Sequence, residues 1–512
     1  MPVIGLIAFT GPAFLLCSAF VSGSSSSSLA GESQSKRRLR IAILGGGIGG
    51  TSCAYHLSKL AVERGVSLDL DLFESGRVGG RARLLEFGGQ MYESGGSIIH
   101  DKNLYMERFT KEFGLKRRSN DDDLDRFAVV DGNRTVFSTS DSSWRTLLTL
   151  LWRYRFDLIR FKLLIRRMLA DFGKIYRLQD EGRSFDTVES LLGAMSPEFV
   201  EQLGRTSEEF LRERGFGADF VAELVSAIER VNYGQSPKAM GAFAGNVGLA
   251  GSGGDLWSVV GGNWQVADRL LSGSGANWKK CHVTNVTKTE DGKFEVAGVV
   301  SQGGDAVDAT LDDYDAIVVA FPLMTTEAGP VRFQGVDPAA VEGASGPFHQ
   351  TVATFVEGTV RVSTFGQLDE RHFLDSVVNC KEGDWFCSLG RQTAADSEGA
   401  KKPKEKKKSE SATAVWKVFS PERLTKAQLD KLFSVVREKR EVVWRAYPSY
   451  ALTTLPKKRS FVLAPGLYYI NAIEWAASAM EMSAIGGRNV ALLLARDFMS
   501  PADDETTHRT EL

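Results

Sequence analysis

Cysteine, net charge and long apolar runs are all scarce in this sequence, and each shortage excludes a class of protein. One of the five cysteines precedes residue 30, and the other four are too few for a disulfide-held scaffold. The formal net charge is −2, so no global field selects for nucleic acid. Beyond residue 30, no apolar run approaches the roughly 20 residues that a membrane-spanning helix needs. The sequence also has neither a metal-ligand cluster nor a nucleophile triad.

An apolar run does occur near the N-terminus. Residues 3–21 are interrupted only by Gly, Pro, Thr and Ser, and a serine tract follows at residues 24–28. The pattern predicts a signal peptide over residues 1–30 and a linker over residues 31–38. Because a positively charged start is missing, an uncleaved anchor helix is the alternative.

A dinucleotide-binding pattern follows the linker. Residues 39–44 have the composition of a short buried strand, and G-x-G-x-x-G and a helix-like segment come directly after it. In this pattern Gly45 permits a tight turn, Gly47 lets the backbone approach a diphosphate, and Gly50 lets helix and strand pack closely. The free N–H groups at the start of the helix would face the diphosphate. Glu74 ends a second predicted strand, where it can accept hydrogen bonds from a ribose diol.

The residues after Glu74 favour a flavin over a nicotinamide cofactor. Residues 74–81 resemble the R-x-G-G-R element of the flavin-dependent amine-oxidase-like superfamily. Two glycines let the chain turn back over the diphosphate, which Arg81 can neutralise; a surface salt bridge is the alternative for Arg81. Residues 92–97, Tyr-Glu-Ser-Gly-Gly-Ser, resemble the segment that runs under the flavin ring in that superfamily. Simple nicotinamide dehydrogenases lack this pair.

Residues 151–172 carry two apolar stripes at helical spacing, separated by rows of Arg and Lys. The narrower stripe contains Trp152, Phe156, Ile159 and Leu163, and the broader one contains Leu158, Phe161, Leu164, Ile165, Met168, Leu169 and Phe172. One stripe can pack on the core, and the other needs more protein, an apolar ligand or a membrane. We hypothesise that Phe161, Leu164, Ile165, Met168 and Phe172 contact an apolar ligand or a membrane. Burial of both stripes between protein layers is the alternative.

The remaining patterns indicate two interleaved domains. Residues 314–322 are almost wholly apolar, as in a central parallel strand. Residues 466–499 have the pattern of a strand followed by a helix, which completes the Rossmann-type sheet. The predicted fold class is therefore α/β, with a Rossmann-type FAD-binding domain interleaved with an α+β substrate domain. The FAD-binding parts are residues 39–100, 251–330 and 461–498. The substrate domain comprises residues 101–250, which are mainly helical, and residues 331–460, with a lysine-rich insertion at 395–412.

Four segments together resemble the prenylcysteine oxidase family, which includes the plant farnesylcysteine lyases. They are Tyr92–His100, Arg230–Gln235, Leu256–Asn263 and Tyr468–Asn489, and the resemblance spans residues 40–498. It implies an FAD enzyme that cleaves the thioether of S-prenyl-L-cysteine, either farnesyl- or geranylgeranylcysteine, in the breakdown of prenylated proteins. The implied products, formed with O2 and water, are cysteine, a prenyl aldehyde and H2O2. The apolar ligand considered above would then be the prenyl chain. The lysine-rich insertion departs from the family pattern.

Thirteen residues are expected to bind FAD. They are Gly45, Gly47, Gly49, Gly50, Glu74, Arg81, Gly95, Gly96, Ser97, Val283, Glu474, Trp475 and Met480. His100 is the candidate catalytic residue, because it is a titratable group beside the expected flavin path and could activate water or the substrate amine. A structural histidine is the alternative. No metal is expected.

The expected partners are S-prenylcysteine and O2, with peripheral membrane association and no nucleic acid. The sequence specifies no oligomeric state. The leader and the glycosylation sequons at Asn133 and Asn285 indicate the secretory pathway, with the lysosome as the expected compartment and the ER lumen or secretion as alternatives. Three other functions compete: a flavin amine or polyamine oxidase, a non-catalytic secreted flavin-binding protein, and a nicotinamide-dependent reductase.

Overall fold

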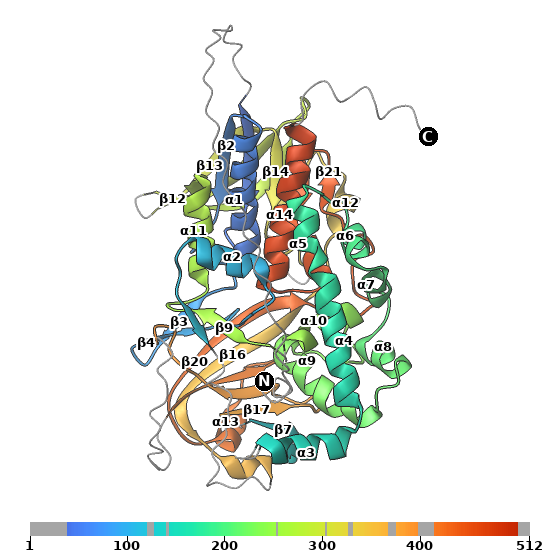
Figure 1. Cartoon of the computed structure of the whole chain (residues 1–512). Helices are drawn as coiled ribbons and strands as arrows, with labels where there is room; N and C mark the ends of the chain where they lie inside the picture. The colour runs from blue at the N-terminus through green and yellow to red at the C-terminus, as the bar shows by residue number, and fades with distance from the viewer. Residues whose placement is uncertain are drawn as a thin grey trace.

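The computed structural model describes residues 38–119, 127–139, 143–251, 254–302, 305–325, 331–366, 375–397 and 414–499. The predicted signal peptide, residues 31–37 of the linker and residues 398–412 of the lysine-rich insertion lie outside this part of the chain. Figure 1 shows two stacked regions, with α1 and α14 side by side in the upper one and a curved sheet in the lower one.

A six-stranded sheet forms the upper region. Its strand order is β10-β2-β1-β14-β22-β21, with bounds Asn277–Lys279, Leu68–Phe73, Leu39–Leu44, Ala316–Val319, Leu467–Tyr469 and Val462–Ala464. The first five strands are parallel and β21 pairs antiparallel to β22. The central strands β1 and β14 are almost wholly buried, as their apolar sequences require. The predicted strands at residues 39–44 and 68–73 are confirmed, and the predicted apolar strand at 314–322 contains β14.

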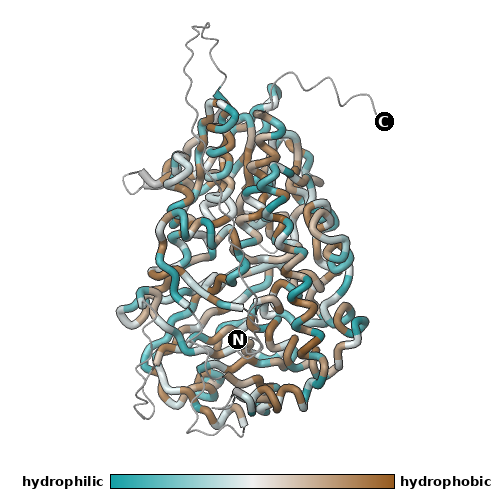
Figure 2. The backbone as a smooth tube through the Cα atoms, viewed as in Figure 1, coloured by the Kyte–Doolittle hydropathy of each residue, from teal (hydrophilic) through white to brown (hydrophobic). Residues whose placement is uncertain are grey.

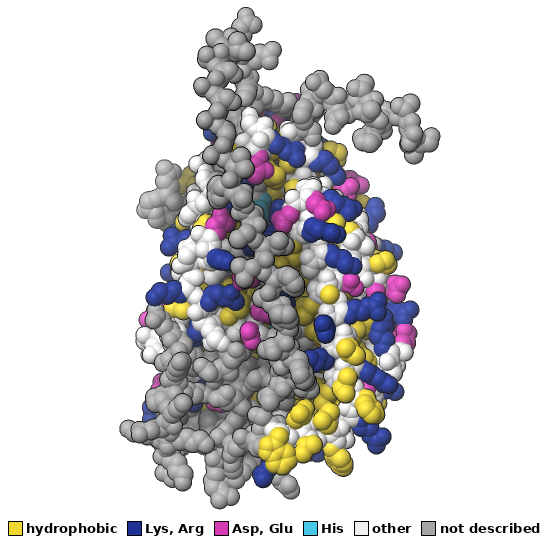
Figure 3. All heavy atoms as spheres, in the orientation of Figure 1, with side chains coloured by type: hydrophobic (Ala, Val, Ile, Leu, Met, Phe, Trp, Pro, Cys, Tyr) yellow, Lys and Arg dark blue, Asp and Glu magenta, His cyan; other side chains and the backbone are white. Residues whose placement is uncertain are grey.

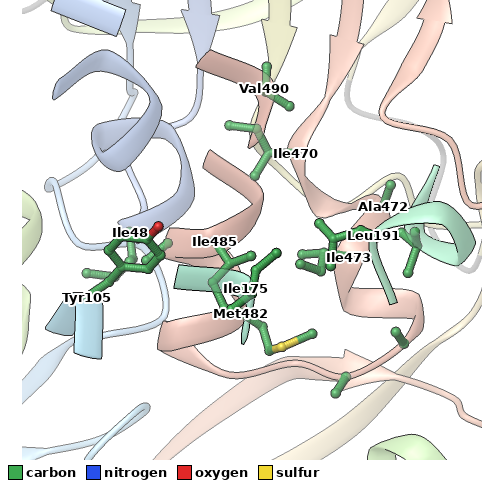
Figure 4. Packing of buried hydrophobic residues seen from close by; sticks show 14 of the residues in the cluster. Ile48, Tyr105, Ile175, Leu191, Ile470, Ala472, Ile473, Met482, Ile485 and Val490 are labelled. Atoms are coloured by element: carbon green, nitrogen blue, oxygen red, sulfur yellow. The ribbon is translucent and has the colours of Figure 1, made fainter. Parts of the chain in front are cut away.

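Helices from distant parts of the chain cover this sheet. They are α1 (Ile48–Glu63), α2 (Leu104–Glu112), α11 (Trp264–Ser274) and α14 (Met480–Phe498), with the 3-10 helix η5 (Ile470–Trp475) before α14. In Figure 4, Ile48 of α1, Tyr105 of α2 and Ile485 of α14 lie in one apolar cluster. A β-sheet of β13, β12, β11 and β15 adjoins it, with bounds Asp305–Tyr314, Phe294–Gln302, Cys281–Lys288 and Arg332–Gln334. β11 and β12 pair antiparallel as a hairpin.

A seven-stranded sheet and a layer of helices form the lower region. The strand order is β20-β16-β19-β18-β17-β7-β8, with bounds Phe433–Pro448, Phe348–Val360, Ala414–Ser420, Ser388–Arg391, Ser376–Asn379, Phe127–Asp131 and Arg134–Ser138. In Figure 1 the helices lie to the right of this sheet and below it, and some of them rise to the level of α14. They are α3 (Ser143–Tyr154), α4 (Asp157–Phe172), α5 (Lys174–Asp180), α6 (Val188–Met195), α7 (Pro197–Gln202), α8 (Ser207–Glu213), the π-helix η3 (Phe220–Val225), α9 (Ser226–Tyr233) and α10 (Ala242–Ala250).

Short elements complete the two regions. They are β3 (Leu84–Phe87), β4 (Gln90–Glu93), β5 (Ile99–His100), β6 (Arg117–Ser119), β9 (Leu256–Val259), α12 (Pro338–Glu342), η4 (Val362–Phe365) and α13 (Lys426–Leu432). In the described residues, no helix has the length and apolar character needed to cross a bilayer. The same residues contain no cluster of metal-ligand side chains. Cys53, Cys281, Cys380 and Cys387 are buried free thiols.

The structure overturns the hypothesis about the broader stripe of residues 151–172. The segment is two helices, because Arg155 has a φ of +48° and ends α3. Phe161 is 1% exposed and packs against Phe220, and Ile165 and Met168 are also buried. The broader stripe is therefore core, and it cannot contact a membrane. The narrower stripe is the exposed one, since Trp152 is 82% exposed.

Candidate cofactor-binding site

The turn between β1 and α1 holds three glycines in three different surroundings. Gly45 has a φ of +118°, and a Cβ there would lie 2.7 Å from the Ala320 carbonyl oxygen. A Cβ at Gly50 would overlap the Gly45 carbonyl oxygen, so helix and turn pack only without a side chain. At Gly47 the nearest atom to a Cβ is 4.0 Å away. The glycine expected to approach a diphosphate is thus the one beside open space, and this turn fits that group.

Glu74 holds the glycine turn from the end of the neighbouring strand. Its Oε2 accepts a hydrogen bond from the Gly46 N–H at 3.0 Å, and its Oε1 accepts one from the Gly76 N–H at 2.7 Å. The parallel register, which pairs Leu44 with Phe73, brings these residues to one edge of the sheet. A carboxylate has about four acceptor positions. Two positions therefore remain for a ribose diol.

Arg81 and Glu474, both expected to contact the cofactor, pair with each other across the chain. The Arg81 Nη1 donates to Glu474 Oε2 at 2.9 Å and to the Ala446 carbonyl oxygen at 2.9 Å, and Nη2 pairs with Oε1. Asn471 donates a further hydrogen bond to Glu474 Oε1 at 2.7 Å. This bidentate pair joins the N-terminal and C-terminal parts of the site. The role of Arg81 toward the diphosphate stays a prediction.

Three side chains from separate segments fix the backbone of residues 93–96. The Asn263 Nδ2 donates to the Gly96 carbonyl oxygen at 3.0 Å, and the Asn263 N–H donates to Glu93 Oε1 at 2.7 Å. The Trp444 Nε1 donates to the Ser94 carbonyl oxygen at 2.8 Å. Lys417 donates from Nζ to the Glu93 carbonyl oxygen at 3.2 Å. The protein's own hydrogen bonds therefore fix the segment that is expected to run under the flavin ring.

The C-terminal helix meets this segment and the glycine turn. A Cβ at Gly96 would lie 3.5 Å from the Met480 Sδ, at the start of α14, and Ser97 follows half-buried. A Cβ at Gly95 would overlap the Arg81 carbonyl oxygen. Gly49 packs toward the same helix, because a Cβ there would lie 3.4 Å from the Ser483 carbonyl oxygen. The structure thus brings together predicted residues from both ends of the chain.

Val283 and Trp475 lie on opposite flanks of this arrangement. Val283 is buried in β11, four residues after Lys279, whose carbonyl oxygen accepts a hydrogen bond from the Glu74 N–H at 3.1 Å. Trp475 is buried in η5, and its Nε1 donates to the Ala344 carbonyl oxygen at 3.1 Å. Val283 thus follows in sequence the strand that pairs beside Glu74, and its predicted contact with the cofactor stays a prediction. Trp475 fixes η5 against the segment that contains Ala344.

His100 contacts its own turn and the neighbouring segment around β9. Its Nδ1 accepts a hydrogen bond from the Lys102 N–H at 3.0 Å and lies 3.0 Å from Asp101 Oδ1. A Cβ at Gly254 would lie 2.6 Å from the His100 Nε2. Burial opposes ionisation of Asp101, but the neighbouring side chains of His100 and Lys102 lower the pKa of Asp101 to about 2. These contacts favour the structural alternative for His100, and its catalytic role stays a prediction.

Lys417 is a residue of this site that the sequence reasoning missed. Its side chain is buried, over the rings of Phe355 and Phe419, and burial lowers the pKa of its ammonium to about 8. Burial likewise raises the pKa of Glu93 to about 7, against a hydrogen bond from Asn263. The sequence feature that could have revealed Lys417 is a single lysine between the apolar residues of Ala414–Ser420. Such a group can donate a hydrogen bond or exchange a proton beside residues 93–96.

An aromatic cluster connects this site to the seven-stranded sheet. The Tyr233 ring meets Tyr447 and Tyr450 edge-on, at centroid distances of 5.2 Å and 5.4 Å. The Tyr233 hydroxyl donates to the Ser478 carbonyl oxygen at 3.0 Å, and the Tyr450 hydroxyl donates to the Glu474 carbonyl oxygen at 3.1 Å. These contacts join two of the family-like segments found in the sequence.

The two sequons lie in different surroundings. Asn133 is exposed in the turn between β7 and β8. Asn285 is half-buried in β11, and its Nδ2 donates to Thr287 Oγ1 at 2.7 Å. Glycosylation at both positions stays a prediction.

Known proteins resemble this chain over most of its length. Residues 137–505 match the model of the family described as prenylcysteine lyase, and residues 43–113 match that of the NAD(P)-binding Rossmann-like domain. Prenylcysteine oxidase 1 of Homo sapiens is 38% identical over 467 residues, covering 89% of this chain and 88% of that protein. Prenylcysteine oxidase 1-like of Homo sapiens is 34% identical over 461 residues, covering 89% of this chain and 90% of that protein.

Solved structures of amine oxidases share the fold. Putrescine oxidase bound to putrescine has a TM-score of 0.57 at 14% identity, covering 90% of this chain and 100% of that one. Cyclohexylamine oxidase from Brevibacterium oxydans has a TM-score of 0.57 at 16% identity, with the same coverage. At these identities the likeness concerns the fold alone, and it confirms the predicted class of a Rossmann-type domain combined with a second domain.

Proposed function

Because the chain belongs to the prenylcysteine lyase family, we propose that it is an FAD-dependent prenylcysteine oxidase that cleaves the thioether of S-prenyl-L-cysteine. With O2 and water as co-substrates, the products are free cysteine, a prenyl aldehyde and H2O2. The observation that carries this conclusion is the 38% identity to prenylcysteine oxidase 1 over 89% of the chain. It extends through both regions, so it covers the cofactor site and the substrate side together.

The chain's own residues hold and orient the cofactor. The glycine turn and the first turn of α1 would receive the diphosphate, and Glu74 would receive the ribose diol. Residues 93–97 would lie under the ring, with their carbonyl groups tied by Asn263, Trp444 and Lys417. When bound, FAD supplies the chemistry of accepting a hydride from the carbon next to sulfur and passing the electrons to O2.

Few protein acids or bases are needed for such a reaction, and the site offers few. Lys417 donates to the Glu93 carbonyl oxygen, in the segment that would lie under the ring, and its lowered pKa allows the neutral amine above about pH 8. Tyr233 and Tyr450 hold the segment before α14 through its carbonyl oxygens. We assign these tyrosines a positioning role, and His100 is the remaining candidate for activating water.

Two experiments test this proposal. Heat or acid treatment of purified protein should release a yellow cofactor, because the predicted FAD-binding residues include no Cys or His to form a covalent link. The protein should then convert farnesylcysteine or geranylgeranylcysteine to aldehyde and H2O2 in equal amounts. Putrescine is the control substrate, because the fold is shared with putrescine oxidase. Turnover of putrescine without turnover of either thioether would replace the proposal with an amine oxidase, and a colourless protein that added FAD does not restore would exclude both.

We also propose that the protein works in the lysosome, with peripheral association to its membrane. The predicted leader and the sequons at Asn133 and Asn285 support this placement, because both are features of proteins of the secretory pathway. A tagged full-length chain should co-localise with a lysosomal marker, and accumulation in the ER or the medium would contradict this.

A further inference from the structure

Six large apolar side chains of α3 and α4 are at least half exposed. They are Trp144, Leu148, Trp152, Phe156, Ile159 and Leu163, which we call the α3–α4 ridge. In Figure 3 hydrophobic side chains gather at the lower right, where Figure 1 places α3 and α4, and Figure 2 shows hydrophobic residues along the same helices. Single exposed apolar residues are normal, but a contiguous group with two tryptophans marks an interaction surface.

The ridge is not the side of these helices that packs on the protein core. The opposite sides of both helices are buried, through Leu150 and Tyr154 of α3 and Phe161 and Ile165 of α4. The helices are therefore already docked on the protein, and the ridge is a second apolar surface. Its spacing, four residues apart in α3 and then three and four in α4, keeps these side chains on one side of each helix.

Basic side chains surround the ridge. Residues 143–172 contain seven Arg and Lys but two Asp, a balance of +5, whereas the whole chain has a net charge of −2. Some are engaged: Arg153 pairs with Glu223, and Arg167 lies 3.6 Å from a Glu198 carboxylate oxygen. Within the described part of the chain, Arg155 and Arg166 are exposed and have no carboxylate partner. The ridge thus combines apolar side chains with uncompensated positive charge.

We propose that the α3–α4 ridge docks this protein onto the surface of an anionic phospholipid bilayer. Tryptophan and phenylalanine insert at the boundary between headgroups and acyl chains, and arginines beside them meet the headgroup phosphates. A second copy of the chain fits less well, because pairing two ridges would bring two groups of like charge together. The proposal rests on the proposed function in one respect: a prenylated substrate partitions into membranes, so docking would bring the enzyme to it.

The test uses the FAD-loaded chain and sedimentation with sucrose-loaded vesicles of phosphatidylcholine, with or without phosphatidylserine. Wild type should bind the anionic vesicles, and less so in high salt. Trp152→Ser with Phe156→Ser should reduce the partition coefficient at least tenfold. Arg155→Gln and Arg166→Gln should each reduce it about fivefold on anionic vesicles only. Val62→Ser is the matched control, because Val62 on α1 is as exposed as Trp152, and it should bind like wild type.

Thermal melting and FAD content check that each variant is folded. Fluorescence quenching is a second measurement, and it needs no polar substitution. Brominated phospholipid should quench the tryptophan fluorescence of the wild-type protein, and the Trp152→Phe variant should show less of this quenching. The proposal is overturned if wild type fails to bind anionic vesicles, if the double variant binds as well as wild type, or if light scattering reveals a dimer that the double variant abolishes. Turnover of dispersed farnesylcysteine, measured in parallel, reports separately on the proposed function.

Discussion

Two buried carboxyl groups differ in what surrounds them. In the cofactor-binding region Glu474 is 1% exposed, and its carboxylate meets the guanidinium of Arg81. In the helical region Glu229 is 0% exposed, and among the described residues its carboxylate has the Ser207 hydroxyl as its hydrogen-bond partner and no cation. The helical region also exposes Trp152 and Phe156. In the cofactor-binding region, the ion pair between Arg81 and Glu474 fixes segments that are distant in sequence. In the helical region, the buried carboxyl group of Glu229 has no such partner, and apolar side chains lie on the surface.

The sharpest test of this contrast lies in α4 and its N-cap residue Phe156, where both kinds of surface occur within a few residues. Phe161→Ala should lower the free energy of unfolding by about 3–5 kcal/mol, because it removes a buried ring from the core. Phe156→Ala, at a 72% exposed ring, should change it by less than about 0.5 kcal/mol. Denaturant unfolding of both variants measures the difference. Equal losses would mean that the α3–α4 ridge is covered by protein.

A smaller effect is expected in the cofactor region, at Glu74. Replacing Glu74 by Ala removes a charge-assisted acceptor worth about 1.5–3 kcal/mol, so FAD affinity should fall roughly ten- to a hundredfold. Titration of the apoprotein with FAD measures the affinity. Glu74→Gln is the matched variant, because it keeps one acceptor oxygen and should lose less. Unchanged affinity in Glu74→Ala would show that another acid binds the ribose.

The last effect concerns the pH dependence produced by Glu229. Burial raises the pKa of this carboxyl from 4.5 to about 8 in the folded chain. Between these values the unfolded chain has lost the proton while the folded chain keeps it, so stability falls as the pH rises. Glu229→Gln imitates the protonated form, so it should melt like wild type near pH 5 and above wild type near pH 8. Parallel pH profiles of the two melting temperatures would contradict this assignment.

The sequence predicted the parts of the fold whose signals are local. The strands at residues 39–44 and 68–73 and the glycine turn between them follow from apolar runs and from backbone conformations that favour glycine. The pairing of Arg81 with Glu474 could not be predicted, because it depends on how segments 393 residues apart meet. Lys417 was missed for the same reason: its partner is a carbonyl oxygen of a distant segment.

The prediction for the two stripes of residues 151–172 was wrong for a different reason. Both stripes have helical spacing and comparable hydrophobicity, so the local pattern indicates that two faces are apolar without indicating which one meets the core. That choice depends on Phe220 and the other residues that pack against Phe161. The break between α3 and α4 occurs at Arg155, a non-glycine residue with positive φ. No glycine or proline is present there to predict it.

The strand order of the six-stranded sheet has a consequence for synthesis of the protein on the ribosome. β14 pairs with β1 on one side and with β22 on the other, and β22 begins at Leu467. Until Leu467 and the residues that follow it have emerged, β14 is an unprotected edge of four buried apolar residues. A nascent or prematurely terminated chain that ends before β22 would therefore expose an aggregation-prone edge, and it would lack Glu474 and α14 as well. The cofactor site is thus completed only when β22 and α14 have been synthesised.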